Sequence, residues 1–321
     1  MTGIPPILAA LLALTLTAAV PAQAEDELVP TPKPAPARPT STTLAASPGE
    51  TLMKTAAAEM DLHQSVSAKL RQQIDLFRHQ LVGSGTYQQR GRGDAMLLRM
   101  ELKIQVADRV SSLLQVCDGH SFWVHQDLFD GPTLGRINLD RVRAARQVQP
   151  ATSEPPGIWP ALGGLPKLLR NLDDSFFFTT VSETRLDRVP VWSMQGSWER
   201  EKLIDMLPDQ KDAILAGRAD FSKLMDHLPD RVRILLGRDD LFPYRIEYWR
   251  NVTKKGEKTG TPRLLVVMEL FEIQLDGALD ARLFVYQPGG LREQDQTAGY
   301  LKKLGLVEPV TNSAARPRGV R

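Results

Sequence analysis

The chain has 321 residues but a single cysteine, Cys117, which excludes an internal disulfide and a metal cluster held by several cysteines of one chain. It also has little net charge. Its 40 basic and 38 acidic residues leave a formal charge of +2, which gives no indication of a nucleic-acid or anionic-membrane partner. Hydrophobic residues make up 42% of the chain, enough for one large folded domain or two small ones, and this excludes a wholly disordered polymer.

Recognisable catalytic motifs are lacking as well. The sequence has no Gly-x-Ser-x-Gly nucleophile motif, and Cys117 ends a predicted strand instead of beginning a helix that would favour its thiolate. Gly83-Ser84-Gly85 lacks the Lys-Ser/Thr of a phosphate-binding loop and predicts a turn. The acidic pairs Asp173-Asp174 and Asp239-Asp240 are typical of turns or helix caps, because adjacent carboxylates usually diverge. We therefore expect a non-enzymatic protein without a cofactor.

One pair of histidines is close enough in sequence to be considered as a metal site. His120 and His125 flank a predicted turn, and Asp118 or Asp127 would complete a set of zinc ligands. The spacing matches no known zinc signature, so surface histidines are the preferred interpretation. No metal site is predicted.

The first 24 residues have the pattern of a signal peptide. They contain no charged side chain, and the apolar stretch from Ile7 to Val20 is followed by Ala22-Gln23-Ala24. The stretch is shorter than the roughly 18–20 residues of a membrane-spanning helix. We expect cleavage near Ala24 and a periplasmic or otherwise exported protein. Because the segment lacks the usual Lys or Arg at its start, retention as an N-terminal membrane anchor stays an alternative.

Composition divides the rest of the chain into three parts. Residues 25–50 contain six prolines among Ala, Thr and Ser, which predicts an extended, disordered spacer. Residues 308–321 are polar and predict a disordered tail. A single folded domain is expected over residues 51–307.

The first part of this domain shows two kinds of hydrophobic periodicity. Hydrophobic residues first recur at helical spacing: Leu62, Val66, Leu70, Ile74, Phe77 and Leu81. This spacing predicts an amphipathic helix that Ser84-Gly85 ends. Alternation then predicts strands over residues 98–106, 110–117 and 122–124, with a tight turn at Asp118-Gly119. These three strands are expected to form an antiparallel meander.

The second part of the domain is also mostly strand. The predicted strands are residues 176–181, 191–198, 231–236, 242–250 and 263–275, and the predicted short helices are residues 165–172, 201–207 and 220–228. In the first half of 263–275 hydrophobic residues occupy both faces. Two-sided burial of an antiparallel strand indicates helices packed on the sheet or a cavity enclosed by it.

Several segments together resemble the LolA-type outer-membrane lipoprotein carriers. They are Gly85–Gln89, Leu114–Val124 with its Asp-Gly and Trp, Pro243–Tyr248 and Leu283–Gly289. The resemblance covers about residues 60–290. It implies a mainly β fold with helices (α+β): an incomplete, strongly curved antiparallel β-barrel lidded by helices on its concave face, with an apolar cavity for acyl chains.

We accordingly expect an exported lipid- or lipoprotein-binding protein that holds acyl chains between sheet and helices, with a thioether-rich wall that adapts to varied ligands. The candidate lipid-binding residues are Met100, Leu102, Ile104, Trp192, Met194, Trp198, Val266, Met268 and Leu270. The expected partners are lipoprotein or lipid acyl chains and an envelope membrane protein as donor or acceptor, with the protein itself a monomer. The alternative is an envelope scaffold or sensor domain of the same fold whose core is filled by its own side chains, tethered by the spacer and an uncleaved N-terminus. A third alternative is a hydrolase whose site has no recognisable motif.

Export is testable directly. The mature protein recovered from the envelope fraction is expected to begin at Glu25, since the small residues before it match a signal-peptidase site. Intact-mass measurement of the purified protein checks this. A mass that includes residues 1–24 would instead establish the anchored form.

Overall fold

The computed structural model describes residues 47–76, 79–106, 109–128, 131–149, 162–252 and 260–307. The predicted leader, residues 25–46 of the predicted spacer and the predicted tail lie outside these residues. The described part folds around one sheet of twelve strands in the order β12-β6-β5-β4-β3-β2-β1-β11-β10-β9-β8-β7. The strands are β1 (Ser65–Leu76), β2 (His79–Arg90), β3 (Leu97–Val106), β4 (Arg109–Cys117), β5 (Ser121–Leu128), β6 (Gly131–Asn138), β7 (Phe176–Leu186), β8 (Val189–Trp198), β9 (Arg231–Gly237), β10 (Pro243–Val252), β11 (Thr261–Leu275) and β12 (Glu293–Asp295).

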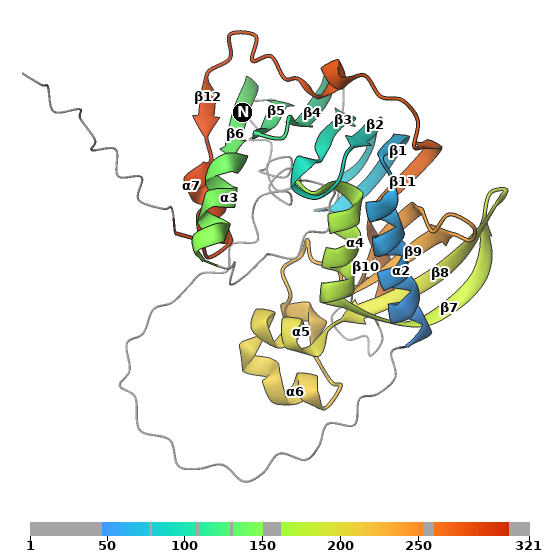
Figure 1. Cartoon of the computed structure of the whole chain (residues 1–321). Coiled ribbons are helices and arrows are strands. Elements are labelled where there is room, and N and C mark those ends of the chain that lie inside the picture. Colours follow the sequence, from blue (N-terminus) through green and yellow to red (C-terminus); the bar gives the residue numbers. More distant parts are fainter. Residues whose placement is uncertain are drawn as a thin grey trace, which may run out of the picture.

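The sheet is open and curved, with helices on its concave side (Figure 1). Its neighbouring strands are antiparallel, except that β12 runs parallel to β6. The helices are α2 (Pro48–Leu62), α3 (Leu139–Val148), α4 (Gly164–Ser175), α5 (Arg200–Met206), α6 (Lys211–Leu215) and α7 (Thr297–Lys303), with short 3-10 turns at Gly93–Ala95, Pro208–Gln210, Phe221–Lys223 and Ala281–Phe284. The predicted fold class, an incomplete barrel lidded by helices, is confirmed.

Helix α2 begins earlier than the end of the predicted spacer at residue 50. Ser47 caps it: the Ser47 hydroxyl accepts from the backbone N–H of Glu50, and the Glu50 carboxylate accepts from the N–H of Ser47. Pro48 occupies the first turn, where a helix needs no proline N–H. Ser47 and Pro48, which the sequence analysis assigned to a spacer, therefore mark the start of a helix.

The predicted amphipathic helix over residues 62–81 is wrong. This segment contains the end of α2 and the hairpin of β1 and β2, in which Val66 pairs with Gln89 and Ile74 with Leu81. In β1 every second side chain is buried, and Ala68 and Gln72 are among them. Residues four apart lie on one side of a strand as well as of a helix. Because Ala68 is weakly hydrophobic and Gln72 is polar, the alternation of inward-facing side chains along this strand could not be recognised from the hydrophobic residues.

The predicted turn at Gly83–Gly85 is also wrong, because both glycines lie inside β2. There they allow the strands to approach closely at the curve of the sheet. A Cβ atom at Gly85 would lie 1.8 Å from the carbonyl oxygen of Glu101 on β3. A Cβ atom at Gly83 would lie 2.9 Å from the Ile104 side chain. The glycines therefore set how tightly the sheet bends here.

The meander of β3, β4 and β5 is confirmed, with Leu98 opposite Cys117 and Cys117 opposite Phe122. The turn at Asp118-Gly119 is also as expected. Gly119 has a φ of 91°, and the Asp118 carboxylate accepts from the backbone N–H groups of His120 and Ser121.

The core lies between the concave face and helices α2 and α4, which lie side by side across the sheet (Figure 1). Helix α4 includes the predicted helix 165–172 and buries its leucine stripe at Leu165, Leu168, Leu169 and Leu172. Tyr87 of β2 ties this helix to the sheet. Its hydroxyl accepts from the N–H of Leu165 at 2.8 Å and donates to Gln89 Oε1 at 2.6 Å.

Strand β11 is buried on both sides in its first half, as expected, but its second half departs from simple alternation. Glu272 has a φ of 50°, and the pairing with β1 shifts register between Ser67 and Lys69. The resulting bulge reverses which side chains face inward. Phe271 therefore lies under the guanidinium of Arg71, while Ile273 packs against the core.

The outer face carries a continuous ladder of alternating charges. Glu269 pairs with Arg71 on one side and with Arg245 on the other, and Glu247 pairs with Arg245 and Arg233. This side of the sheet is polar, as expected for an antiparallel sheet with one packed face.

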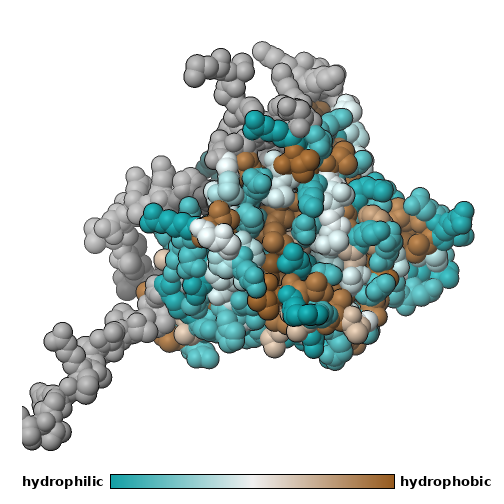
Figure 2. Space-filling view, turned by 90° about the horizontal axis from the view of Figure 1, so that it is seen from above, coloured by the Kyte–Doolittle hydropathy of each residue, from teal (hydrophilic) through white to brown (hydrophobic). Residues whose placement is uncertain are grey.

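Seen from above the view of Figure 1, the described surface is mostly hydrophilic, with hydrophobic side chains gathered in a strip near its centre (Figure 2).

The connection between β8 and β9 differs from the sequence prediction. The helix over residues 201–207 is confirmed as α5, whereas residues 220–228 contain only a 3-10 turn at Phe221–Lys223. Arg250, which is buried on β10, holds this segment in place by donating to four of its backbone carbonyls. The acceptors are Phe221, Leu224, Met225 and Leu228. Several other elements were not predicted either, namely α2, α3, α6, α7, β6, β12 and the 3-10 turns at Gly93–Ala95, Pro208–Gln210 and Ala281–Phe284.

Replacing Gly85 with alanine tests whether the close approach of strands β2 and β3 at this position is needed for stability. A backbone oxygen cannot give way as a flexible side chain can, so we expect G85A to lower the free energy of unfolding by about 3 kcal/mol. The matched control is G299A in α7, where a Cβ atom meets nothing within 4 Å; alanine there is expected to be neutral or to stabilise by up to about 1 kcal/mol. Urea unfolding measures both, and equal stability of the two variants would contradict the prediction.

Candidate functional site

The nine candidate lipid-binding residues share the concave side of the sheet. All are buried except Trp192, which is partly buried, and all belong to or pack against the single hydrophobic core. Strand pairing places Met194, Met268 and Ile104 in one row across the sheet, through Ile234, Ile246, Gln72 and Gly83. Leu270 and Leu102 share the next row through Leu70 and Gly85. Their contact with a lipid stays a prediction.

The structure places a cavity elsewhere, at one end of the helical lid that α2 and α4 form over the sheet. A cavity with a volume of about 390 Å³ lies among the end of α2, the start of α4, helix α3 and the connection between β2 and β3. This volume is within the roughly 300–1,000 Å³ of typical ligand sites. None of the nine candidate residues lines it. Trp192 instead lines an open groove beside Leu52 and Val181.

The inner wall of the cavity is largely apolar and contains two thioethers. Met60 comes from α2, Met96 and Cys117 from the ends of β3 and β4, and Leu139 and Val142 from α3. Each of these side chains is buried. Side chains of this kind can pack against the hydrocarbon part of a ligand.

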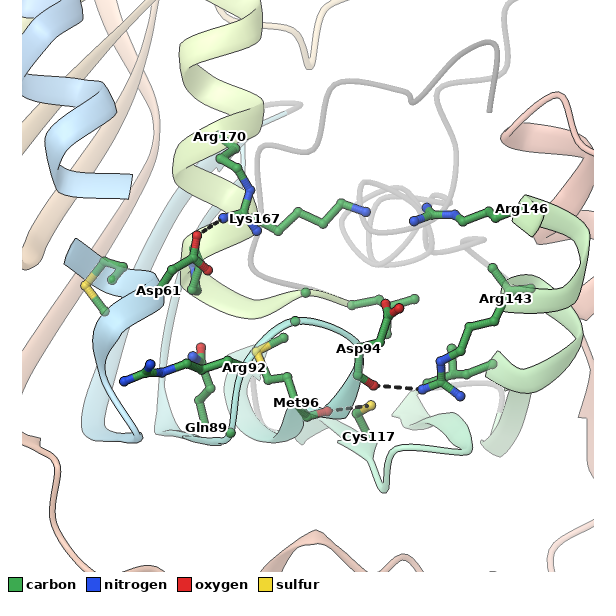
Figure 3. A pocket seen from close by; sticks show the side chains of 18 of the residues that line it. Asp61, Gln89, Arg92, Asp94, Met96, Cys117, Arg143, Arg146, Lys167 and Arg170 are labelled. Atoms are coloured by element: carbon green, nitrogen blue, oxygen red, sulfur yellow. Dashed lines mark hydrogen bonds and ion pairs between the residues drawn. The ribbon is translucent and has the colours of Figure 1, made fainter. Parts of the chain in front are cut away.

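The rim of the cavity is basic. Its lining includes five basic and two acidic side chains: Arg92, Arg143, Arg146, Lys167 and Arg170 against Asp61 and Asp94. Figure 3 shows that Lys167 from α4 and Arg146 from α3 extend toward each other across the opening. Basic side chains thus outnumber acidic ones in the lining, although the whole chain is nearly neutral.

Backbone contacts fix several of the cations. Arg143 donates to the carbonyl of Asp94 at 2.8 Å and pairs with Asp140 at 2.6 Å. Arg92 donates to the carbonyl of Leu62, at the end of α2. A bond to a neutral carbonyl orients an arginine without cancelling its charge. Arg170, in contrast, forms an ion pair with Asp61.

Lys167 lies in the first turn of α4, and this turn contains no acidic residue. The N-cap residue Gly163 has a φ of 98° and no side chain to cap the helix. The Tyr87 hydroxyl takes over part of this role, because it accepts from the backbone N–H of Leu165.

Cys117 lies at the floor of the cavity but is not a reactive thiol. Burial raises its pKa, and its Sγ donates to the carbonyl of Met96 at 3.4 Å. At neutral pH the thiol is protonated, so it acts as a small hydrophobic group. This agrees with the sequence-based view that Cys117 is not a nucleophile.

One amide on the concave face has no partner at all. Gln115 of β4 is completely buried, and neither its Nε2 nor its Oε1 has a hydrogen-bond partner. It lies opposite Met100 on one side and Val124 on the other, one row from Cys117. An unpaired buried amide costs stability. It is the clearest polar irregularity in the described core.

The histidine pair considered from the sequence is not brought together as a metal site. His120 pairs with Asp140 at 3.1 Å, whereas the ring of His125 contacts Tyr286. Asp118 is occupied by the backbone of its turn and by the indole N–H of Trp123. Among the residues that the structure describes, no group of three potential metal ligands occurs.

The cavity residues were not found from the sequence. The usable signal was the basic stretch Arg141–Arg146, whose helical spacing places Val142 and Ala145 inward and Arg143 and Arg146 toward the rim. The contributions of α2, α4 and the β2–β3 connection come from segments far apart in sequence. Only the packing of the helices on the sheet brings them together.

Replacing Gln115 with methionine tests whether its amide is unpaired. Methionine has a similar shape and no polar group, so Q115M is expected to raise the free energy of unfolding by about 1–2 kcal/mol. The control is Q73M on the exposed side of β1, with an expected change near zero. Chemical unfolding of the ligand-free protein provides the measurement. A clear loss of stability in Q115M would show that the amide is hydrogen-bonded in solution.

Comparison with known proteins gives similarity at the level of structure. No family model matches the chain, and no curated protein matches it. No helix in the described ranges is long and apolar enough to cross a membrane.

Similar solved structures include a LolA superfamily protein from Nitrosomonas europaea, with 12% identity, a TM-score of 0.26, and coverage of 74% of this chain and 97% of that one. A domain described as outer membrane lipoprotein-sorting, from Vibrio parahaemolyticus, has 9% identity, a TM-score of 0.31, and coverage of 74% and 95%. The MucA/MucB complex of Pseudomonas aeruginosa has 10% identity and a TM-score of 0.37, and the match covers 74% of this chain and 60% of that one. Similarities of this strength carry no argument about function. What the structure itself establishes is the open, curved antiparallel sheet with helices on its concave side (Figure 1).

Proposed function

We propose that the protein is an exported, non-enzymatic binding protein for lipids or the acyl chains of lipoproteins. The observation that carries this proposal is the cavity of about 390 Å³ at the end of the helical lid, with an apolar inner wall open to a polar rim. An amphiphile has the same division into hydrocarbon and polar parts. Each methylene buried in such a site contributes about 0.8 kcal/mol, so a short stretch of acyl chain gives useful affinity.

In this proposal the hydrocarbon enters between the lid and the sheet. Met60 at the end of α2 and Pro166 at the start of α4 line the cavity, and the same helices contribute to the core that contains or contacts the nine candidate residues. Separation of α2 and α4 from the sheet would extend the cavity toward Met100 and Leu102. Those residues then form the wall of the longer site.

The alternative, a scaffold or sensor with a self-filled core, has its own supporting observation. Eight of the nine candidate residues are buried against other side chains of the chain in the closed structure. A core of this kind needs no ligand to be stable. Under this alternative the protein would act through its surface, with the proline-rich residues 25–46 as a spacer.

Native mass spectrometry distinguishes the lipid-binding protein from the scaffold or sensor. Protein purified from the envelope fraction, with its N-terminus as processed by the cell, is expected to carry a lipid or acylated peptide that solvent extraction releases and identifies. A homogeneous ligand-free mass that stays unchanged after incubation with lipoprotein would reject binding and favour the scaffold or sensor.

A pair of matched variants places the ligand. L162W adds bulk at the partly buried Leu162 of the cavity lining, and L215W makes the same change at an exposed position of α6. We expect at least a fivefold loss of co-purified lipid in L162W and no change in L215W, because only the first fills the cavity. Equal lipid content in both variants would place the ligand outside this cavity.

A further inference from the structure

We propose that the buried amide of Gln115 binds the linkage of an amide-linked acyl chain, with its Nε2 donating to the acyl carbonyl and its Oε1 accepting from the amide N–H. This inference rests on the proposed function and adds the chemical class of the ligand. Its basis is one unpaired side chain and its place on the concave face, between the cavity and the candidate lipid-binding residues.

Gln115 differs from the other polar groups of its neighbourhood on the concave face. The Tyr87 hydroxyl, two strands away in the same row, donates to one side chain and accepts from the backbone of α4. The Cys117 thiol, two residues further along β4, donates to the carbonyl of Met96. The Nε2 and Oε1 atoms of Gln115 are buried, and neither has a partner. Because an unpaired donor and an unpaired acceptor both cost free energy in the interior, a ligand that pairs both is favoured.

A second unpaired amide oxygen lies along the same row of the sheet. Gln115 pairs with Val124, and Val124 pairs with Gly135. The Gln296 side chain lies directly over Gly135, because a Cβ atom there would be 2.6 Å from the amide carbon of Gln296. The Gln296 Oε1 atom is buried and also has no partner. Two unpaired acceptors on one side of the sheet favour a ligand that brings a hydrogen-bond donor.

Gln115 also lies between the cavity and the hydrocarbon-binding wall of the proposed function. Cys117, one row away on β4, lines the cavity (Figure 3). Met100 lies opposite Gln115 on β3, and Leu102 lies in the following row. An amphiphile with its polar end in the cavity and its hydrocarbon along Met100 and Leu102 therefore has its linkage at Gln115.

The donor and acceptor on Gln115 distinguish between the common linkages of an acyl or alkyl chain. A secondary amide has a carbonyl oxygen for Nε2 and an N–H for Oε1. An ester has the carbonyl oxygen but no hydrogen to donate, and an ether has neither a carbonyl nor a donor. Sites that hydrogen-bond a ligand discriminate against analogues that leave their buried polar groups unpaired. Gln115 therefore favours an amide over an ester and an ester over an ether.

Isothermal titration calorimetry on the delipidated protein tests this order with three soluble lipids. Each has a phosphocholine headgroup and two eight-carbon chains, and the chains are joined through amide, ester or ether bonds. We expect the amide-linked lipid to bind at least about tenfold more tightly than the ether-linked lipid, with the ester-linked lipid between them.

The variant Q115M removes the donor and the acceptor but keeps a side chain of similar shape. It is expected to reduce the preference for the amide-linked over the ether-linked lipid to less than about threefold, by weakening only the binding of the amide-linked lipid. The matched control is Q73M on the exposed side of β1, which is expected to keep the preference. Thermal unfolding of both variants checks that each is folded as the wild type is.

The outcomes separate this inference from the function on which it rests. Equal binding of all three lipids would overturn the role of Gln115 and leave lipid binding intact, as would a preference that Q115M retains. Binding of the ester-linked lipid as tight as that of the amide-linked lipid would overturn the selection of an amide. Binding of none of the three would overturn the proposed function and this inference together.

Discussion

The rest of the structure depends on the burial of two helical stripes, those of α2 and α4, against the concave side of one curved sheet. The leucines of α4 and the methionines and alanines of α2 form a single core with strands from both halves of the chain. The sheet is open at β12 and β7, so it gains no stability from barrel closure. The helices supply the hydrophobic contact that closure would otherwise provide, and Tyr87 fixes α4 to β2 through its hydroxyl.

The candidate site follows from this packing. Where α2 ends and α4 begins, the lid no longer covers the sheet, and helix α3 closes the remaining side. The inner part of this gap is lined by core residues such as Met96 and Leu139, while the outer part is lined by the charged ends of the helices. A division into apolar wall and basic rim is thus a consequence of where the helices end.

One feature of the described core is unfavourable for stability. Gln115 buries an amide whose nitrogen and oxygen both lack a hydrogen-bond partner. Its side chain lies on the concave face, in the row next to that of Cys117, which lines the cavity. Violations of this kind are more frequent at functional sites than elsewhere.

Local periodicity and turn residues predicted a mainly antiparallel β domain with helices, the meander of β3 to β5, helix α4 and the two-sided burial of β11. The strong curvature and the incomplete barrel came from the resemblance to a known family. The sequence did not determine β1 and β2: hydrophobic residues four apart fit a helix as well as a strand, and the pairing with β11 decided between them. It assigned Gly83–Gly85 to a turn, because only the neighbouring β3 shows why a side chain is excluded there.

The cavity could not be predicted, since Met60, Arg92, Arg146 and Lys167 are distant in sequence and meet only when the lid packs on the sheet. Local pattern determined which elements form, and tertiary packing decided which of their ends meet to make a site.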